Sequence, residues 1–553
     1  MDPMNSHLST DVSNPPTPRQ SEPEEAPMGV SAGRDVTVYD QNQSLFFCLP
    51  NETKSMVIRY LGLREITRLV TVCKYLRDLV ENDKALERAW IRRFPSPYQY
   101  QLKTLVTAKD EQQLRDWLKP SANEDTVKSL VKHRDSAYFH ALVLFNKSKL
   151  MSQCKKFHLV KKATIIHRHD VETATLSTDN RYLVTASLDS NVKICAREAD
   201  GSWKEKTTIS HNCWVISATF SADGRQLVTA SRDHTAKICS ERDDGSWEVE
   251  TTISHNSWIN TSSFSADGSH VVTASHDHTA KICGRDDDGS WSIKATIQHD
   301  GPVKSASFSC DGRHVLTASI DHMAKIYVRK ANGSWEEKTT IAHEDKVFSA
   351  SFSADGRYVV TAGEDHTAKI YGLQDDSSWE EKATISHEGA VYSASFSLDG
   401  LHVVTASKDN TATIYGLKAS GSWEKEATIN HIRAATSANF SADGRHVVTT
   451  SADNTSKIYG LRADGSWVEK LTITHDDWVL SATFSPDGCL VVTASCDKKA
   501  KIYGLGHNGS WVIKAIISHK RPITSATFST DGRYIVTASE DYTARITELR
   551  GSN

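Results

Sequence analysis

The chain has 553 residues, a formal net charge of −4 and the composition of a soluble globular protein, so its length predicts several domains. None of its ten cysteines forms a CxxC pair, and most lie in apolar strand patterns, which favours buried free thiols over a disulfide framework or a zinc site. The longest apolar run of the N-terminal helical region, Ala141–Phe145, is too short for a signal peptide or a membrane span. We therefore expect a cytoplasmic or nuclear protein without membrane contact.

Residues 1–42 are rich in proline and acidic side chains. Two arginines and seven acidic residues give residues 1–40 a net charge of −5. Almost nothing in this stretch offers apolar surface to offset the entropy of ordering, so we expect a disordered tail.

Residues 43–95 have the pattern of a small helical module. It opens with Leu49-Pro50-Asn51-Glu52, where Pro suits the first helical turn and Glu its positive end. An Ile-x-Tyr-Leu core, a Val-Cys-Lys-x-x-Arg helix and a late tryptophan follow in order. This combination resembles an F-box.

The F-box resemblance implies a partner. About 46 residues bury little core by themselves, and F-boxes dock their apolar helices on a Skp-type adaptor that links them to a cullin–RING ubiquitin ligase. By the resemblance, the residues that face the adaptor or support that face are Leu49, Pro50, Ile58, Leu61, Leu69, Val72, Leu76 and Trp90. The alternative is a small helical cap packed on the rest of the chain.

Residues 96–155 are predicted to be a helical linker. Apolar residues from Leu102 to Leu118 fall near helical spacing, Pro120 ends that run, and Ser121–Glu124 has the form of a capping box. Tyr138, Phe139, Leu142 and Phe145 extend the apolar pattern, and we interpret these aromatic residues as packed core rather than a ligand site.

Residues 156–549 form an internal repeat with a constant period of 44 residues. Nine histidines from His167 to His519 and nine aspartates from Asp189 to Asp541 keep this spacing without insertion or deletion. Within each copy, four short alternating segments are separated by turn signals such as Asp223-Gly224. Four strands per copy predict a propeller blade rather than a helical solenoid.

The copies resemble WD repeats. The resemblance implies an all-β propeller of nine 44-residue repeats that form nine blades, preceded by the small all-α F-box-like module and the helical linker. Residues 157–166 look like a fourth strand and the last copy ends after a third, so the first segment is predicted to complete the last blade. The alternative is that one degenerate copy lies outside the ring, and the first copy departs most from the others.

The resemblance also implies a buried hydrogen-bond network in each blade, formed by a His, a Ser or Thr, a turn Asp and a third-strand Trp. It corresponds here to His211, Thr229 and Asp233 in the second copy, and to His343, Thr361, Asp365 and Tyr371 in the fifth. A tyrosine hydroxyl is expected to close the network, and the cysteines of the first three copies only weakly. We favour this structural role over a metal site, because no third ligand recurs at a constant offset, and we expect no cofactor.

The copies differ most at the residues after the repeat His and before the turn Asp. In the WD-repeat fold these positions surround the channel mouth, where family members hold peptides and proteins. Aromatic and charged residues there suit binding hot spots, although drift in solvated loops also varies such positions. The residues of this predicted target-binding face are Trp214, Arg232, Trp258, His276, Lys346, Glu364, Lys408, Arg433, Trp478, Arg521 and Glu540.

These features together indicate a substrate-recognition adaptor of a ubiquitin ligase that is not itself an enzyme. No nucleophile motif, P-loop or dinucleotide fingerprint occurs in the sequence. Basic rim residues would suit a phosphorylated target, whereas Glu364 and Glu540 argue against a uniformly cationic face. Nucleic acid is not an expected partner, because the repeat region is slightly acidic. The competing interpretation is a WD-repeat scaffold without ligase association.

Overall fold

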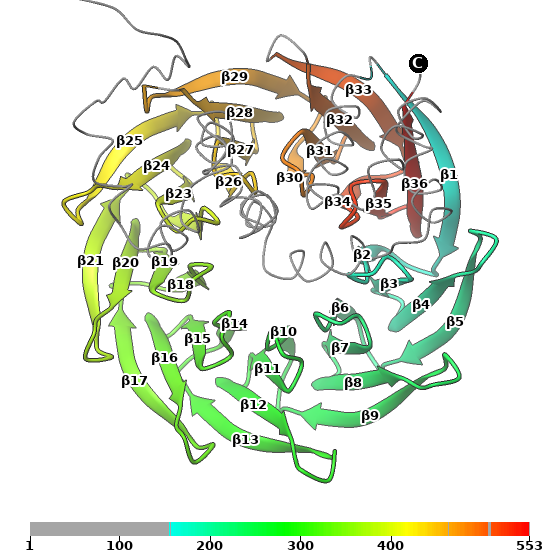
Figure 1. Cartoon of the computed structure of the whole chain (residues 1–553), viewed down its shortest axis with the longest axis horizontal. Helices are drawn as coiled ribbons and strands as arrows, with labels where there is room; N and C mark the ends of the chain where they lie inside the picture. The colour runs from blue at the N-terminus through cyan, green and yellow to red at the C-terminus, as the bar shows by residue number, and fades with distance from the viewer. Residues whose placement is uncertain (1–153, 155, 463, 507–509, 552–553) are drawn as a thin grey trace, which may run out of the picture. The chain divides into compact units, whose positions relative to one another are not determined.

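The computed structural model describes residues 154, 156–462, 464–506 and 510–551, which form a closed ring of nine four-stranded antiparallel sheets (Figure 1). The prediction of a nine-bladed propeller is confirmed. The tail, the F-box-like module and nearly all of the linker lie outside the described residues. No helix long and apolar enough to cross a membrane occurs in the part that the structure describes.

Each of the first eight blades is built from four consecutive strands, the innermost first. Blades 1 to 3 consist of β2 (Val171–Leu176), β3 (Tyr182–Ser187), β4 (Asn191–Arg197), β5 (Trp203–Ser210), β6 (Val215–Phe220), β7 (Gln226–Ser231), β8 (Thr235–Glu241), β9 (Trp247–Ser254), β10 (Ile259–Phe264), β11 (His270–Ser275), β12 (Thr279–Arg285) and β13 (Trp291–Gln298). Blades 4 and 5 consist of β14 (Val303–Phe308), β15 (His314–Ser319), β16 (Met323–Arg329), β17 (Trp335–Ala342), β18 (Val347–Phe352), β19 (Tyr358–Gly363), β20 (Thr367–Leu373) and β21 (Trp379–Ser386).

The remaining blades follow the same order until the last one. Blades 6 to 8 consist of β22 (Val391–Phe396), β23 (His402–Ser407), β24 (Thr411–Leu417), β25 (Trp423–Asn430), β26 (Ala435–Phe440), β27 (His446–Ser451), β28 (Thr455–Leu461), β29 (Trp467–Thr474), β30 (Val479–Phe484), β31 (Leu490–Ser495), β32 (Lys499–Leu505) and β33 (Trp511–Ser518). Blade 9 combines β34 (Ile523–Phe528), β35 (Tyr534–Ser539) and β36 (Thr543–Gly551) with β1 (Phe157–Ile166).

The ring is closed by pairing between the two ends of the repeat region. Strand β1 runs antiparallel to β36, from Phe157 opposite Gly551 to Ile166 opposite Thr543, with a β-bulge at Lys162. The predicted completion of the last blade by the first segment is therefore confirmed. The alternative that one copy lies outside the ring is wrong, because the first copy forms blade 1 and its core is shared with blade 9.

A buried ion cluster, the closure clasp, joins the strands of blade 9. The carboxylate of Glu548 is fully buried and lies 3.0 Å from Lys162 Nζ, 2.5 Å from Arg533 Nη2 and 2.9 Å from Arg550 Nη2. Seven of the other copies have Gly, Ala or Ser at the position of Glu548, and one has Val. Because no other copy has an acidic residue at this position, the repeat pattern did not predict the closure clasp.

The core of the propeller lies between neighbouring blades. In blades 2 to 8, the tryptophan that opens the outer strand packs on the phenylalanine of its own innermost strand and on the second strand of the preceding blade. Trp423, for example, has ring centroids 6.0 Å from Phe396 and 5.7 Å from Tyr358. Such offset and edge contacts add to the burial of Val and Ile in every interface.

The cysteines only partly follow the expectation of buried thiols. All eight described cysteines are free, and Cys195, Cys239 and Cys283 are buried between blades, where desolvation raises the pKa of Cys195 and Cys239 to about 12. Cys310, by contrast, is exposed, since it lies in a turn rather than in a strand.

Candidate functional site

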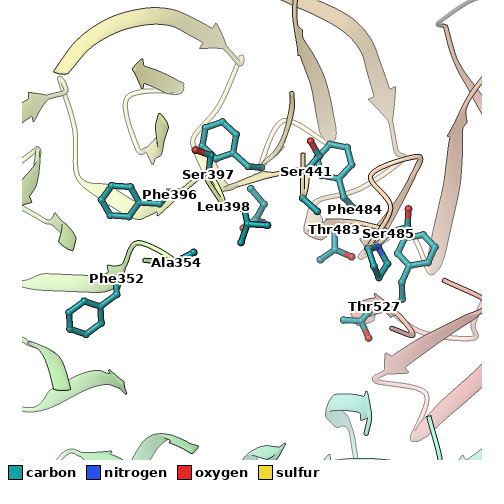
Figure 2. Close-up of a pocket in the computed structure, with 15 residues that line it drawn as sticks. Phe352, Ala354, Phe396, Ser397, Leu398, Ser441, Thr483, Phe484, Ser485 and Thr527 are labelled. Atoms are coloured by element: carbon teal, nitrogen blue, oxygen red, sulfur yellow. The ribbon is translucent and has the colours of Figure 1, made fainter. Parts of the chain in front are cut away.

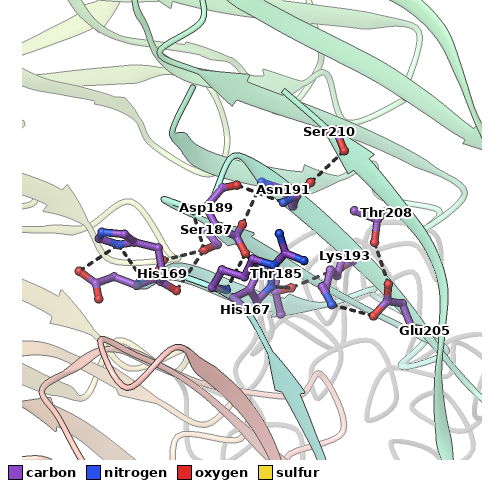
Figure 3. A network of polar contacts seen from close by, with 12 residues as sticks. His167, His169, Thr185, Ser187, Asp189, Asn191, Lys193, Glu205, Thr208 and Ser210 are labelled. Carbon is purple, nitrogen blue, oxygen red and sulfur yellow. Dashed lines mark hydrogen bonds and ion pairs between the residues drawn. The ribbon is translucent and has the colours of Figure 1, made fainter. Parts of the chain in front are cut away.

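One end of the propeller strands carries nine similar loop pairs that are held by side-chain hydrogen bonds. In blade 1, His167 Nδ1 lies 3.0 Å from Asp189 Oδ2 and its Nε2 lies 2.8 Å from the hydroxyl of Thr185 (Figure 3). The same Asp189 oxygen accepts the backbone N–H of Arg168 at 2.8 Å. The network thus joins the loop before the innermost strand to the turn after the second strand.

This network recurs in all nine blades. The His Nδ1 to Asp Oδ2 distances are 2.7–3.2 Å and the His Nε2 to Thr Oγ1 distances are 2.8–2.9 Å. It includes the residues singled out from the sequence, His211 with Thr229 and Asp233, and His343 with Thr361 and Asp365.

Burial and hydrogen bonding set the charge states of this network. Burial lowers the pKa of His211, and the neighbouring Asp233 offsets this only in part. Burial tends to raise the pKa of Asp233, but hydrogen bonds from Thr235, the Asn212 amide and His211 outweigh it and lower this pKa to about 2. A neutral imidazole that donates from Nδ1 to a carboxylate therefore holds each loop pair in place.

Tyr371 differs from its predicted role. Its hydroxyl donates to Glu381 Oε2 at 3.1 Å on the neighbouring outer strand, and not to the His343 network. The network needs no fourth member, because the histidine and the backbone amides already satisfy the Asp365 carboxylate. The described residues also contain no group of three His, Cys, Asp or Glu side chains arranged to hold a metal.

Two variable positions per blade form what we call a rim pair. The first is the third residue after the repeat His and the second is the residue before the turn Asp. In every blade the backbone N–H of the second donates to the carbonyl of the first, at 2.7–3.0 Å. The nine rim pairs are Asp170–Leu188, Trp214–Arg232, Trp258–His276, Pro302–Ile320, Lys346–Glu364, Ala390–Lys408, Ala434–Ala452, Trp478–Cys496 and Pro522–Glu540.

The rim pairs of blades 2 and 3 meet in an aromatic–cationic cluster. The guanidinium of Arg232 lies 4.7 Å from the ring centroid of Trp214 and 4.9 Å from that of Trp258, so it sits between rings of adjacent blades. The ring of His276 lies 5.6 Å from Trp258. Trp214 and Trp258 are 41% and 44% exposed, so this ordered cluster presents aromatic surface to solvent. The structure thus brings together four residues that the sequence placed 18 to 62 positions apart.

The other candidate rim residues do not form one continuous patch. Lys346 Nζ lies 2.5 Å from Glu364, so these two charges largely neutralise each other. The guanidinium of Arg521 lies 5.3 Å from the ring centroid of Tyr542, and the backbone N–H of Glu540 donates to the carbonyl of Pro522.

Three rim residues project into solvent on blades 6 to 8. Lys408 and Arg433 are exposed, and Trp478 is 51% exposed. Ile432, which the sequence analysis did not select, is 84% exposed beside Arg433. Comparison of the copies could have identified Ile432, because the other eight copies have a polar or charged residue at this position.

A second concave feature lies at the opposite end of the innermost strands. It is a hollow of about 420 Å³ that spans blades 5 to 9 (Figure 2). Its lining is mainly apolar and includes Phe352, Phe396, Leu398, Phe484 and Pro486, with Ser and Thr hydroxyls between them. The sequence analysis did not predict this hollow, because its lining comes from five blades that are distant in the sequence.

Comparisons with known proteins agree with this architecture. The family model described as "WD domain, G-beta repeat" matches residues 160–195, 203–240, 247–283, 291–327, 335–372, 379–415, 423–460, 467–504 and 510–547. The F-box domain model matches residues 46–88. Among curated proteins, no relative matches the chain.

Solved structures of similar fold include Sqt1 from Chaetomium thermophilum. One crystal structure is 16% identical with a TM-score of 0.50, covering 70% of this chain and 97% of that one. A second is 15% identical with a TM-score of 0.50, covering 72% and 100%. A third, of Sqt1 bound to the N-terminus of the ribosomal protein L10, has 15% identity, a TM-score of 0.49 and coverage of 72% and 100%. At such identities the likeness shows the fold alone.

Family models thus account for more than half of the chain, and they agree with the nine blades of the structure. The chain belongs to the WD-repeat family and, with an F-box ahead of its nine repeats, is an F-box/WD-repeat protein.

Proposed function

We propose that this protein is a substrate-recognition adaptor of a cullin–RING ubiquitin ligase. The observation that carries the proposal is the union, in one chain, of an F-box match at residues 46–88 and a nine-bladed ring with a variable rim. The F-box would bind a Skp-type adaptor and the rim would hold a target protein or peptide. The chemistry of ubiquitin transfer would belong to the other ligase subunits.

The adaptor side of the proposal is tested by co-purification. Full-length protein should retain a Skp-type adaptor, and a Leu49→Ala/Pro50→Ala variant should lose it, because both residues open the predicted docking helix. An unchanged thermal transition of the ring would exclude general misfolding. A Trp258→Ala variant is the matched control and should keep the adaptor. Retention of the adaptor by the double variant would contradict the F-box docking mode.

The target side depends on the aromatic–cationic cluster of blades 2 and 3. Because the His–Thr–Asp networks hold its loops, little conformational entropy is lost when a partner covers Trp214 and Trp258. Large, pre-ordered aromatic and arginine side chains dominate many interfaces, and truncating such a hot spot costs about 2 kcal/mol or more, roughly 30-fold in affinity. Trp258→Ala should therefore deplete target proteins in proximity labelling, whereas Ile293→Ala, which removes an exposed side chain on the outer strand of blade 3, should not.

Phosphorylation of the target is a separate part of the proposal. Arg232, Lys408 and Arg433 are the basic rim residues that carry it, since Lys346 is already paired with Glu364. Their combined replacement by Ala should reduce capture of targets from untreated extracts, and phosphatase treatment should have the same effect on the wild type. If neither treatment changes capture, the target is recognised through its unmodified surface.

The alternative is a docking platform without a ligase. The rim is complete within the ring itself, so it would serve such a platform equally well. Target labelling that persists together with no adaptor binding by the wild-type chain would favour this second function. Ubiquitin transfer to a captured target by the reconstituted ligase would favour the first.

A further inference from the structure

The apolar hollow at the end of the propeller opposite the rim has an uncharged lining. Phenylalanines that end the innermost strands of blades 5 to 9, among them Phe396 and Phe484, form much of its wall (Figure 2). Leu398 and Pro486 come from the hairpins that follow the innermost strands of blades 6 and 8, and Ala442 comes from the hairpin of blade 7. At about 420 Å³ the hollow has the size of a ligand pocket, and none of its lining residues in the described part of the chain carries a charge.

Three consecutive blades depart from the repeat at positions that line this hollow. The residue before the hairpin aspartate is Thr, Ala or Cys in seven copies, whereas it is Leu398 in blade 6 and Pro486 in blade 8. In blade 7, Asn439 stands at the last position but one of the innermost strand, where the other eight copies have Ser or Thr. All three residues line the hollow. Side chains that occur only once among nine similar copies are therefore gathered around one concave surface.

The hairpins of blades 6 and 8 also lack a cation that most copies have. The second residue after the hairpin aspartate is Arg in six copies, but it is Leu401 in blade 6 and Cys489 in blade 8. Asp399 Oδ1 accepts hydrogen bonds from the Ser397 hydroxyl at 2.5 Å and from the Leu401 N–H at 3.0 Å, and Asp487 Oδ1 accepts the two equivalent bonds. Among the described residues, no ion pair neutralises either carboxylate. The hollow thus has an uncharged lining and two carboxylates at its edge, each one residue beyond a lining side chain.

We propose that the hollow binds an extended segment of a partner protein in which a large apolar side chain is flanked by Lys or Arg. The apolar side chain lies between Leu398 and Pro486, where binding removes aliphatic and aromatic surface from water. The flanking cations pair with Asp399 and Asp487, so charge complementarity selects basic over acidic segments. The carboxamide of Asn439 is available to the backbone of the segment.

The position of the hollow makes this site independent of the rim. The rim pairs lie at one end of the blade strands and the hollow lies at the other, so a partner in the hollow leaves the rim free. The lining extends over five consecutive blades, which suits an extended chain better than a compact small molecule. The proposal depends neither on association with a ligase nor on the target that the rim holds.

Fluorescence anisotropy with the full-length chain tests the proposal. The basic probe is the peptide Gly-Arg-Leu-Trp-Leu-Arg-Gly carrying a neutral fluorophore, and the acidic probe has Glu in place of both Arg. The wild type should bind the basic probe roughly tenfold more tightly than the acidic one, because only the basic probe can pair with Asp399 and Asp487. Added salt should reduce this difference, since both carboxylates are partly or fully exposed and their ion pairs are screened.

Two double variants separate the apolar and the ionic contributions. Leu398→Ala/Pro486→Ala introduces the residue that blades 5 and 7 have at this position, and it should weaken binding of the basic probe roughly tenfold. Leu401→Arg/Cys489→Arg introduces the arginine of six other copies and should abolish the preference for the basic probe. The matched control is Cys310→Ala, which changes the equivalent hairpin position in blade 4, outside the lining, and should leave both affinities unchanged.

Three results with these probes would overturn the proposal. They are the absence of binding of the basic probe by the wild type, equal affinities for the two probes at low salt, and unchanged affinity in Leu398→Ala/Pro486→Ala. An unchanged melting temperature of each variant excludes misfolding as the cause of a loss. Loss of binding in Trp258→Ala would place the basic probe on the rim and would overturn the proposal as well.

Discussion

Removal of the Glu548 carboxylate should open the ring at its closure. Glu548 is fully buried, Lys162 and Arg533 around it are 23% and 17% exposed, and Arg550 is 47% exposed. Losing one partner of a buried ion pair costs about 3–5 kcal/mol, because the remaining charges stay unpaired in a poorly solvated site. All three cations are partly exposed to water, so the lower end of this range, about 3 kcal/mol, applies to Glu548→Gln. This corresponds to roughly a 100-fold change in the local opening equilibrium.

Native-state hydrogen exchange of β1 and β36 measures this opening directly. In Glu548→Gln, the slowest amides of these two strands should exchange roughly 100-fold faster, while β18 to β21 of blade 5 should change much less. The control Glu381→Gln removes a carboxylate that is partly exposed and should leave β1 unchanged. Equal exchange of β1 in the wild type and in Glu548→Gln would refute a stabilising role for the closure clasp.

The same clasp predicts a pH dependence of defined sign. Burial tends to raise the pKa of Glu548, but Lys162 and Arg533 outweigh it and lower this pKa below 4.5. A lowered pKa in the folded state stabilises the fold above the unfolded value, and this stabilisation is lost as the pH falls through the folded value. The difference between wild type and Glu548→Gln should therefore shrink below about pH 4.5 and be constant at neutral pH.

Three further predictions concern the blades. Asp365→Ala removes the carboxylate that accepts hydrogen bonds from His343 and from two backbone amides. The free energy of unfolding, measured by urea titration, should fall by about 2–3 kcal/mol. The control Asp375→Ala changes an exposed residue and should leave this free energy unchanged. Burial lowers the pKa of His314 and of all nine network histidines below 6.5. Protonation of these histidines therefore favours the unfolded chain, so the melting temperature should fall as the pH drops below about 6.5. A melting temperature that stays constant from about pH 8 to pH 5 would contradict this. Lys382→Glu should stabilise the ring by about 1 kcal/mol, since it offers an acceptor to the buried Trp423 Nε1, as Glu426 does for Trp467 at 2.9 Å; a lower melting temperature would count against it.

Much of the fold was predictable because each blade is specified by local sequence. The 44-residue period, the Asp-Gly turns and the alternating strands are signals within one copy, and nine copies repeat them. The missing fourth strand of the last copy and the extra segment at residues 157–166 predicted the closure that β1 and β36 make. The F-box pattern around Leu49 and Pro50 likewise agrees with the family model over residues 46–88.

The sequence predicted which positions form the rim, but not which of their side chains contact one another. Comparison of the copies located the rim, yet it treated Lys346 and Glu364 as separate binding residues, and in the structure they form an ion pair. Tyr371 was assigned to the histidine network by its alignment with a family position, whereas its hydroxyl reaches Glu381 across the outer strands. Both differences arise because the pairing of long side chains depends on their rotamers and neighbours, and not on the period of the chain.

The sequence by itself determined the number of repeats, the strand order within each repeat and the loops that carry the histidine networks, because hydrophobic alternation and turn chemistry act over a few residues. The structure decided that all nine repeats enter one ring. Only the tertiary structure decided which distant side chains meet. Arg232 lies between two tryptophans of adjacent blades, and the Glu548 carboxylate lies within ion-pair distance of three cations. Such contacts depend on how the ring curves and closes, and ring closure brings together residues that are far apart in the sequence.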